Sequence, residues 1–267
     1  MVAGAVTKRW ALLTGASSGI GRELARLCAA DGYHLVLVAR TAEALEPLAA
    51  ELKLAHPIEV LALGLDLARR EAANELIARL AARALVPEIL VNNAGVGLYG
   101  LHHDVRLEDE IALIDLNVVT LTRLTKRLLP EFLARGSGRI LNVASTAAFQ
   151  PGPYMSVYYA SKAYVLSYSE AIAEEVQGSG VTVTVLCPGP TATAFQARAG
   201  LRGAARILGG LVPIADAASV ARAGYRGMLA GRRLVIPGFT NRLLVQALRL
   251  LPRRLATAAV ARVSRKR

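Results

Sequence analysis

The stretch Trp10-Ala11-Leu12-Leu13-Thr14-Gly15-Ala16-Ser17-Ser18-Gly19-Ile20-Gly21 decides the fold of this chain. Its first part, Trp10 to Thr14, is a short apolar run that predicts a buried strand, and the amphipathic stretch from Ile20 onward predicts a helix. Glycines permit a tight turn and close backbone approach, and a helix N-terminus favours an anion such as a pyrophosphate. A lone glycine turn is often only a turn, but its position between a strand and a helix predicts a phosphate-binding loop.

The glycines of this loop follow the spacing G-x-x-x-G-x-G, which differs from the G-x-G-x-x-G pattern of the common dinucleotide-binding fold. The arrangement of strand, turn and helix is the same in both patterns, so a dinucleotide remains the expected ligand. We expect the cofactor to contact Gly15, Ser17, Ser18, Gly19, Ile20 and Gly21.

The end of the second predicted strand, Leu35 to Ala39, bears on the choice of cofactor. In dinucleotide-binding folds an acid near this point accepts a hydrogen bond from a free ribose 2′-hydroxyl, whereas an arginine accommodates a 2′-phosphate. This chain has Arg40 there and no acid, and a guanidinium suits a phosphate by charge and by geometry. The sequence therefore favours NADP(H) over NAD(H); the alternative is a surface arginine without a role in binding.

Apolar runs typical of strands alternate with helix-like segments, which predicts an α/β fold with a parallel sheet, right-handed crossovers and helices on both faces. The predicted strands begin near Trp10, Leu35, Val60, Ile89, Ile140, Val181 and Leu234. A length of 267 residues suits one sizeable domain, and no repeat or Pro/Ser-rich linker divides the chain. We expect a single doubly wound Rossmann-like domain over residues 1–238 and a basic, apolar helical extension over residues 239–267.

Tyr158 and Lys162 stand four residues apart and so share one face of a helix, and Ser145 lies thirteen residues before the tyrosine. An ammonium beside a phenol favours the phenolate and lowers the tyrosine pKa from about 10 towards the working pH. A serine alongside could hold a substrate oxygen while the tyrosine passes it a proton. Because Y-x-x-x-K alone also fits a packed or solvated helix face, its catalytic interpretation depends on the dinucleotide pattern before it.

Taken together, these motifs resemble the classical short-chain dehydrogenase/reductase family in order and spacing, from about Lys8 to Gly238. Each motif is weak alone, but the set is specific. The matching residues are Thr14 to Gly21, Asp66, Asn92 to Gly95, Asn117, Ser145, Tyr158, Lys162, Pro188, Gly189 and Thr193. The resemblance implies an NAD(P)-dependent oxidoreductase that acts on CH–OH groups and assembles as a homodimer or homotetramer.

The resemblance also implies a catalytic tetrad of Asn117, Ser145, Tyr158 and Lys162. Tyr158 would act as general acid towards a carbonyl oxygen, and Ser145 would donate a hydrogen bond to the same oxygen. Lys162 would lower the tyrosine pKa and hold the nicotinamide ribose together with Tyr158. Asn117 would orient a water that links the lysine to solvent.

Further positions are implied to contact the cofactor. Those on the adenosine side are Asp66, Leu67, Asn92, Ala94 and Gly95. Those on the nicotinamide side are Pro188, Gly189, Thr191 and Thr193. Thr191 departs from the valine that is frequent in the family, but its backbone can still reach the carboxamide.

Cys28 and Cys187 are the two cysteines and do not make a disulfide framework, which favours a reducing, cytoplasmic compartment. The first strand begins within about ten residues, which leaves no room for a signal peptide, and no apolar run reaches the ~20 residues of a membrane span. The four histidines lack ligand-like spacing, so no metal site is expected. His102 and His103 follow the fourth predicted strand, where a substrate loop could lie.

The formal net charge of +12 comes from the last fifth of the chain, because residues 217–267 contain twelve Lys and Arg and no Asp or Glu. Within a predicted leucine-rich helix a narrow polar stripe recurs at helical spacing, and it would continue past Pro252 if the helix did: Arg242, Gln246, Arg249 and Arg253. Such a surface suits peripheral contact with an anionic membrane, or packing on its own domain or a sister subunit. Nucleic-acid binding is disfavoured, because the tail lacks a recognition motif and interleaved aromatics.

The segment 190–213 follows the Pro188-Gly189 motif, at the position where members of the family cover their substrate. Its apolar side chains are Phe195, Leu201, Ile207, Leu208, Leu211 and Val212, and the glycines expected to act as hinges are Gly200, Gly203, Gly209 and Gly210. An apolar lid favours a lipophilic carbonyl or alcohol. The sequence thus predicts an NADP(H)-dependent reductase of such a substrate; the alternatives are a non-catalytic NADP(H) sensor and a membrane-associated interaction protein on the same fold.

Overall fold

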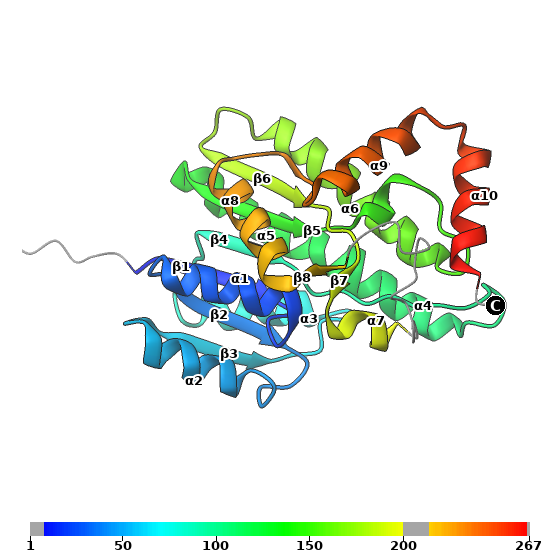
Figure 1. Ribbon diagram of the computed structural model, residues 1–267. Helices are drawn as coiled ribbons and strands as arrows, with labels where there is room; N and C mark the ends of the chain where they lie inside the picture. The colour runs from blue at the N-terminus through cyan, green and yellow to red at the C-terminus, as the bar shows by residue number, and fades with distance from the viewer. Residues whose placement is uncertain (1–7, 200–213, 266–267) are drawn as a thin grey trace, which may run out of the picture.

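Seven parallel strands form one sheet in the order β3-β2-β1-β4-β5-β6-β9 (Figure 1). The computed structural model describes residues 8–199 and 214–265. The strands are β1 (Trp10–Thr14), β2 (His34–Ala39), β3 (Val60–Gly64), β4 (Ile89–Asn92), β5 (Gly138–Val143), β6 (Val181–Leu186) and β9 (Leu234–Val235). The predicted doubly wound parallel sheet is confirmed, although β2 and β5 begin slightly earlier than expected.

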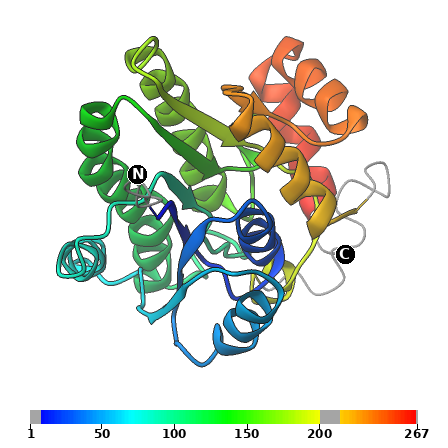
Figure 2. The same ribbon diagram turned by 90° about the vertical axis from the view of Figure 1, so that its left-hand side faces the viewer.

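Helices cover both faces of the sheet (Figure 2). They are α1 (Gly19–Ala30), α2 (Glu46–Ala55), α3 (Ala72–Ala81), α4 (Leu107–Ile114), the π-helix η1 (Asp115–Thr120), α5 (Leu121–Arg135), the 3₁₀-helix η2 (Thr146–Phe149), α6 (Ser156–Glu175), α7 (Ala194–Arg198), α8 (Ala217–Leu229), α9 (Phe239–Leu250) and α10 (Arg253–Ser264). Along β1, Ala11 and Leu13 join the core shared with α1, α2 and α8, whereas Leu12 joins the core shared with α3, α5 and α6. Both faces are therefore buried, which explains the continuous apolar runs of the strands.

The order of the strands reverses between β1 and β4. β2 and β3 are added on one side of β1, whereas β4, β5, β6 and β9 lie on its other side. Doubly wound sheets bind ligands in the crevice outside the carboxyl ends of the strands at this reversal. The glycine loop after β1 and the segment Asn93 to Gly97 after β4 both start at that edge. These two loops are therefore where the fold predicts a ligand.

The C-terminal extension forms two helices, α9 and α10, which lie on the outside of the molecule (Figure 1). Pro252 separates them, because it provides no backbone N–H and keeps Leu251 extended, with φ −78° and ψ 139°. The polar stripe of α9 therefore does not continue into Arg253. Val245 of α9 packs in a buried cluster with Val165 and Cys187.

None of the helices in the described ranges combines the length and the apolar character that a membrane crossing requires.

Two short strands, β7 (Thr191–Ala192) and β8 (Ala215–Asp216), pair in parallel and bring together the two ends of the predicted lid. Phe195 of this lid lies in α7. The other predicted lid residues, Leu201, Ile207, Leu208, Leu211, Val212 and the four glycines from Gly200 to Gly210, lie outside the described residues.

Candidate active site

The glycine loop after β1 has a backbone conformation and close contacts that do not tolerate a side chain at its glycines. Gly15 and Gly19 have φ values of +66° and +56°, in the left-handed region that favours glycine. A Cβ on Gly15 would lie 2.8 Å from the Ala94 Cα, and a Cβ on Gly21 would overlap the Gly15 carbonyl. The N-cap residue of α1, Ser18, makes no side-chain cap hydrogen bond. The first N–H groups of α1 therefore suit an anion such as a pyrophosphate.

Thr14 and Asn93 tie the loops after β1 and β4 together. Thr14 Oγ1 accepts hydrogen bonds of 3.0 Å from the backbone N–H groups of Asn93 and Ala94. Asn93 Nδ2 donates to the carbonyls of Thr14 and Gly15, both at 3.0 Å. In the sequence, neither side chain had a predicted role, and the only signal for them was their position inside the matching motifs.

The predicted catalytic residues Tyr158 and Lys162 both lie on α6 and are buried, with exposed fractions of 8% and 5%. Lys162 Nζ lies 5.9 Å from the centroid of the Tyr158 ring and donates a 2.9 Å hydrogen bond to the Val143 carbonyl. Ser145, at the N-cap of η2, accepts a hydrogen bond from the Ala147 N–H and interacts with the Tyr158 hydroxyl. The structure brings these three side chains together; their catalytic roles remain predictions.

Asn117 completes the group from η1, a π-helical turn of the kind that often marks a functional site. Its amide exchanges two hydrogen bonds with the backbone of Val96, at 3.0 and 2.9 Å, and donates a third to Ser161 Oγ at 3.1 Å. A Cβ on Gly95 would lie 3.1 Å from Asn117 Oδ1 and 3.4 Å from Lys162 Nζ. Both N–H groups of the amide are engaged, so the water predicted at this position could only donate to Asn117 Oδ1 or bind the backbone of η1.

Burial controls the ionisation of the pair. It raises the pKa of the Tyr158 phenol above its ordinary value, and a hydrogen bond with Ser145 acts in the opposite direction. Burial lowers the pKa of Lys162 to about 8. The net shift is therefore opposite in direction to the one expected from Lys162, because loss of hydration dominates it; the lowering of the Tyr158 pKa by Lys162 stays a prediction. A phenol that stays protonated suits a general acid.

The predicted nicotinamide-side residues run from Ser145 to the glycine loop. The Pro188 carbonyl accepts a 2.9 Å hydrogen bond from the Thr146 N–H, and Thr191 Oγ1 donates to the Gly189 carbonyl at 2.9 Å. At the other end, a Cβ on Gly19 would lie 2.8 Å from the Thr193 Cγ2. The segment thus spans the crevice between the phosphate loop and the tyrosine.

The predicted adenosine-side residues differ in whether their side chains are exposed to a ligand. Arg40 and Asp66 are exposed at the ends of β2 and β3, and Asp66 Oδ1 accepts a 3.1 Å hydrogen bond from the Ala68 N–H. The Leu67 side chain is buried, and its carbonyl accepts a 2.7 Å hydrogen bond from Thr120. These positions leave Arg40 available to a ribose 2′-phosphate.

Asn92 does not present its side chain to the crevice. Its Nδ2 donates to Thr125 Oγ1 at 3.1 Å and to Asn142 Oδ1 at 2.9 Å, within the core between the sheet and α5. Asn142 in turn donates to Ser169 Oγ at 2.9 Å. The predicted contact of Asn92 with the cofactor could come only from its backbone; the side chain links the central strands to α5 and α6.

Apolar side chains surround Tyr158 on the substrate side. Leu113, Met155, Tyr158 and Ala199 form a buried cluster against which Tyr99 and Phe195 pack. The Phe195 and Tyr158 ring centroids are 5.4 Å apart, and a Cβ on Gly97 would lie 2.8 Å from Phe195 Cζ. The sequence had marked Phe195 as a lid residue, whereas Tyr99 and Met155 had no signal beyond their apolar character.

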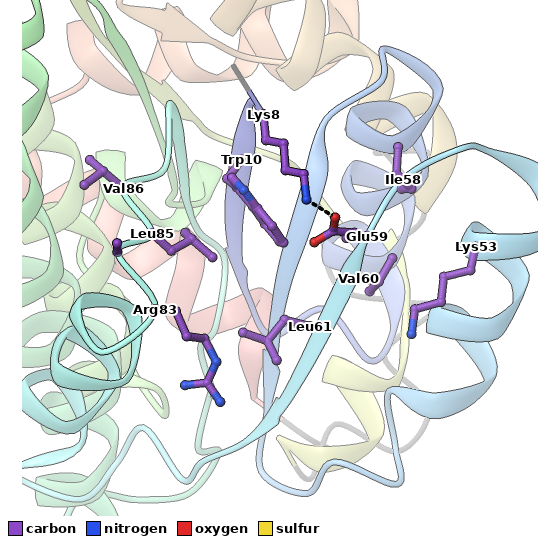
Figure 3. Close-up of a pocket in the computed structure, with 11 residues that line it drawn as sticks. Lys8, Trp10, Lys53, Ile58, Glu59, Val60, Leu61, Arg83, Leu85 and Val86 are labelled. Atoms are coloured by element: carbon purple, nitrogen blue, oxygen red, sulfur yellow. Dashed lines mark hydrogen bonds and ion pairs between the residues drawn. The ribbon is translucent and has the colours of Figure 1, made fainter. Parts of the chain in front are cut away.

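A separate pocket of about 1070 Å³ opens at the amino ends of β1 and β3 (Figure 3). Trp10 and the ion pair between Lys8 and Glu59 line it. It lies at the opposite end of the strands from the loops described above, so it is not the crevice that contains Tyr158.

The histidines do not gather around a metal. No group of three or more His, Cys, Asp or Glu side chains that could hold a metal ion occurs within residues 8–199 and 214–265. His102 Nδ1 lies 3.2 Å from Glu110 Oε1, and His34 Nδ1 accepts a 2.9 Å hydrogen bond from the Glu59 N–H.

The fold and the site define a nucleotide-binding α/β protein with a buried tyrosine, lysine, serine and asparagine at its ligand crevice. The family model described as short chain dehydrogenase matches residues 9–202. The chain belongs to the short-chain dehydrogenase/reductase family, which confirms the resemblance seen in the sequence.

Individual relatives agree with this assignment. The chain is 33% identical to the ketoacyl reductase HetN of Nostoc sp. over 184 residues, 69% of this chain and 64% of that protein. It is 35% identical to a 3-oxoacyl-[acyl-carrier-protein] reductase of Synechocystis sp. over 190 residues, 71% of this chain and 76% of that protein. A short-chain dehydrogenase from Sphingobium yanoikuyae, solved in complex with NADPH, has a TM-score of 0.80 at 34% identity and covers 90% of this chain and 92% of its own. The chain thus spans less than two thirds of the length of HetN.

Proposed function

We propose that this protein is an NADP(H)-dependent oxidoreductase that interconverts a carbonyl and an alcohol on a lipophilic substrate. The observation that carries the proposal is the buried Tyr158 phenol, which interacts with Ser145, lies near Lys162 and faces an apolar cluster. A proton donor, an oxygen-binding hydroxyl and an apolar wall are the protein groups that carbonyl reduction requires.

The residues suit a bound nicotinamide dinucleotide. The glycine loop admits close approach of phosphates to the uncapped N-terminus of α1, and Lys162 and Tyr158 would hold the nicotinamide ribose. When bound, the cofactor supplies a hydride to the carbonyl carbon. Tyr158 donates its proton to the carbonyl oxygen, which Ser145 holds by a hydrogen bond, and the product is the alcohol. Lys162, with a pKa of about 8, then helps to return a proton to the phenolate from the side of Asn117.

The preference for NADP(H) depends on Arg40. Solved relatives occur in complex with NADPH and with NAD, so membership of the family does not decide the cofactor. An exposed arginine directly after β2 favours the 2′-phosphate. We expect kcat/KM for NADPH to exceed that for NADH by at least about tenfold, and Arg40→Leu to remove most of that ratio.

The lipophilic substrate is supported by the cluster of Leu113, Met155, Tyr99 and Phe195 around the tyrosine. Two reductases of ketoacyl groups are among the relatives, which agrees with a carbonyl on an apolar chain. We further propose a cytoplasmic homodimer or homotetramer with peripheral contact to a membrane through the C-terminal tail.

The test is a screen of ketones with the purified full chain, in which NADPH absorbance reports turnover. Reduction of at least one apolar ketone is expected, and its loss in Tyr158→Phe ties the activity to this site. The alternative of a non-catalytic sensor predicts NADPH binding without turnover of any ketone. The buried Tyr158 beside Ser145 and Lys162 supports the catalytic proposal, because a sensor does not need a proton donor.

A further inference from the structure

The face of α9 that points away from the domain is apolar. Phe239, Leu243 and Leu250 are exposed to 80%, 60% and 88%. At 3.6 residues per turn these three side chains lie within about 40° of one another around the helix axis. The buried residues Asn241 and Val245 lie on the opposite side of the helix. The helix therefore has an inner face that holds it to the domain and a second, unpartnered apolar ridge.

Both arginines of α9 lie on the same side of this ridge and contact the domain. Arg242 Nε donates a 2.8 Å hydrogen bond to the Ile236 carbonyl, and the Arg249 guanidinium lies 5.1 Å from the centre of the Phe149 ring. The polar stripe seen in the sequence thus borders the outward face rather than forming it. A leucine and phenylalanine ridge with a basic border is typical of helices that lie in a lipid interface.

Positive charge continues along α10, where Leu255 is also exposed. The exposed arginines there are Arg253, Arg254, Arg262 and Arg265. Within the described ranges, none of these four forms an ion pair. Residues 217–267 contain no acid at all, so the ridge and its surroundings carry unbalanced positive charge.

This charge selects among the surfaces that could cover the ridge. A second copy of the chain would bring its own acid-free, arginine-rich extension to the same contact, and like charges would oppose the pairing. An anionic lipid surface offers the complementary charge and an apolar interior for Phe239 and the leucines. Each basic residue near such a surface adds to this attraction.

The extension also reaches the candidate active site. The Tyr99 hydroxyl donates a 2.7 Å hydrogen bond to the Ser264 carbonyl at the end of α10. The same tyrosine packs against the cluster that contains Tyr158 and stacks on Tyr154, with ring centroids 6.0 Å apart. The wall of the substrate site and the basic extension are therefore in direct contact.

We infer that the outward face of α9, with the arginines of α10, docks on an anionic membrane surface and sets the apolar mouth of the Tyr158 site beside the bilayer. A lipophilic substrate then enters from the lipid phase. The docking specifies the membrane contact proposed above and is argued from the surface, whereas the entry of substrate rests on the proposed reaction.

Vesicle flotation of the full chain tests the docking. Vesicles of equal parts phosphatidylglycerol and phosphatidylcholine are expected to carry the protein upward, and vesicles of phosphatidylcholine alone are expected to carry at least about tenfold less. The triple variant Phe239→Gln, Leu243→Gln, Leu250→Gln is expected to lose flotation at least about tenfold. Leu54→Gln is the matched control, because Leu54 is 92% exposed on α2, and it is expected to float like the unaltered chain.

Absence of flotation with the anionic vesicles overturns the inference. It is also overturned if the triple variant still floats, or if sedimentation shows that the variant dissociates an oligomer while flotation is unchanged, because the ridge is then an interface between copies.

Measurements of turnover distinguish the docking from the entry of substrate through the bilayer. With a vesicle-embedded long-chain ketone the triple variant is expected to lose kcat/KM at least about tenfold, and with a short water-soluble ketone to retain it. If no ketone is reduced, the proposed function fails while flotation still decides the docking.

Discussion

The ammonium of Lys162 donates a 2.9 Å hydrogen bond to the carbonyl of Val143, the last residue of β5. This bond fixes α6 to the carboxyl edge of the sheet, directly before the segment that carries Ser145. The lysine is buried, and burial lowers its pKa from 10.5 to about 8. A group that the fold holds at this cost is expected to act in function rather than in stability.

Replacement of Lys162 by methionine should therefore stabilise the protein while it abolishes turnover. Below pH 8 the lysine is protonated in both the folded and unfolded states, and the folded state bears the full penalty of burying its charge. Between about pH 8 and 10.5 the unfolded chain binds more protons, so the stability of the unaltered protein rises with pH. We expect Lys162→Met to raise the free energy of unfolding by about 1–3 kcal/mol at pH 7, and the gain to shrink towards pH 10.

Urea denaturation of both proteins at pH 7 and pH 10 measures this difference. Lys53→Met on α2 is the control, because Lys53 is exposed and its replacement removes no buried charge. If Lys162→Met stabilises the protein less at pH 7 than at pH 10, burial of the lysine charge does not destabilise the fold.

Replacement of Tyr158 by phenylalanine should remove the proton donor and leave the cofactor site in place. We expect the reduction rate to fall by about 10²–10⁴, with the Kd for NADPH changed less than about threefold. Burial raises the pKa of Tyr158, so the phenol is protonated at neutral pH and the rate of reduction should not depend on its titration there. Alcohol oxidation needs the phenolate and should rise with pH.

Stopped-flow reduction and fluorescence titration of NADPH give the two quantities. Tyr159→Phe is the matched control, since Tyr159 is the neighbouring residue on α6 and meets Tyr158 edge-on at 6.0 Å. An equal loss of rate in both variants would show that the Tyr158 hydroxyl is not the specific proton donor.

The sequence predicted the parallel sheet and the crevice because both follow from local patterns: apolar runs for buried strands and glycines at the first turn. It could not predict the sign of the pKa shift of Tyr158, because desolvation depends on the packing of Leu113, Met155 and Phe195 around it. It also gave Asn92 a place at the cofactor, whereas the side chain bonds with α5 and β5. Such orientations depend on which face of a strand each residue occupies, which a motif does not state.

The side-chain orientation of Asn93 could not be predicted from its motif either, and its hydrogen bonds can be tested by mutation. Its amide bonds to the carbonyls of Thr14 and Gly15 across 79 and 78 residues of sequence. Asn93→Ala would leave both carbonyls without this donor and free the glycine loop to move. We expect a loss of about 1–3 kcal/mol in stability and a weakening of NADPH binding by about tenfold.

Calorimetry with and without NADPH checks the change in Asn93→Ala. Asn74→Ala is the control, because Asn74 Nδ2 donates only to the exposed Glu71 carboxylate on the protein surface. Unchanged NADPH affinity in Asn93→Ala would mean that the loop holds its shape without the link between β1 and β4.

Phe195 is expected to set the size of the substrate. Its ring lies 5.4 Å from that of Tyr158 and fills the space over Gly97, so it limits the room beside the proton donor. Phe195→Ala should raise kcat/KM for bulky ketones relative to small ones by about tenfold, because the removed ring leaves apolar volume that only a larger substrate fills. A series of alkyl phenyl ketones of increasing bulk measures the ratio. Phe239→Ala, which removes an exposed phenylalanine far along the chain on α9, should leave it unchanged for water-soluble ketones. If both variants shift the ratio alike, Phe195 does not line the substrate site.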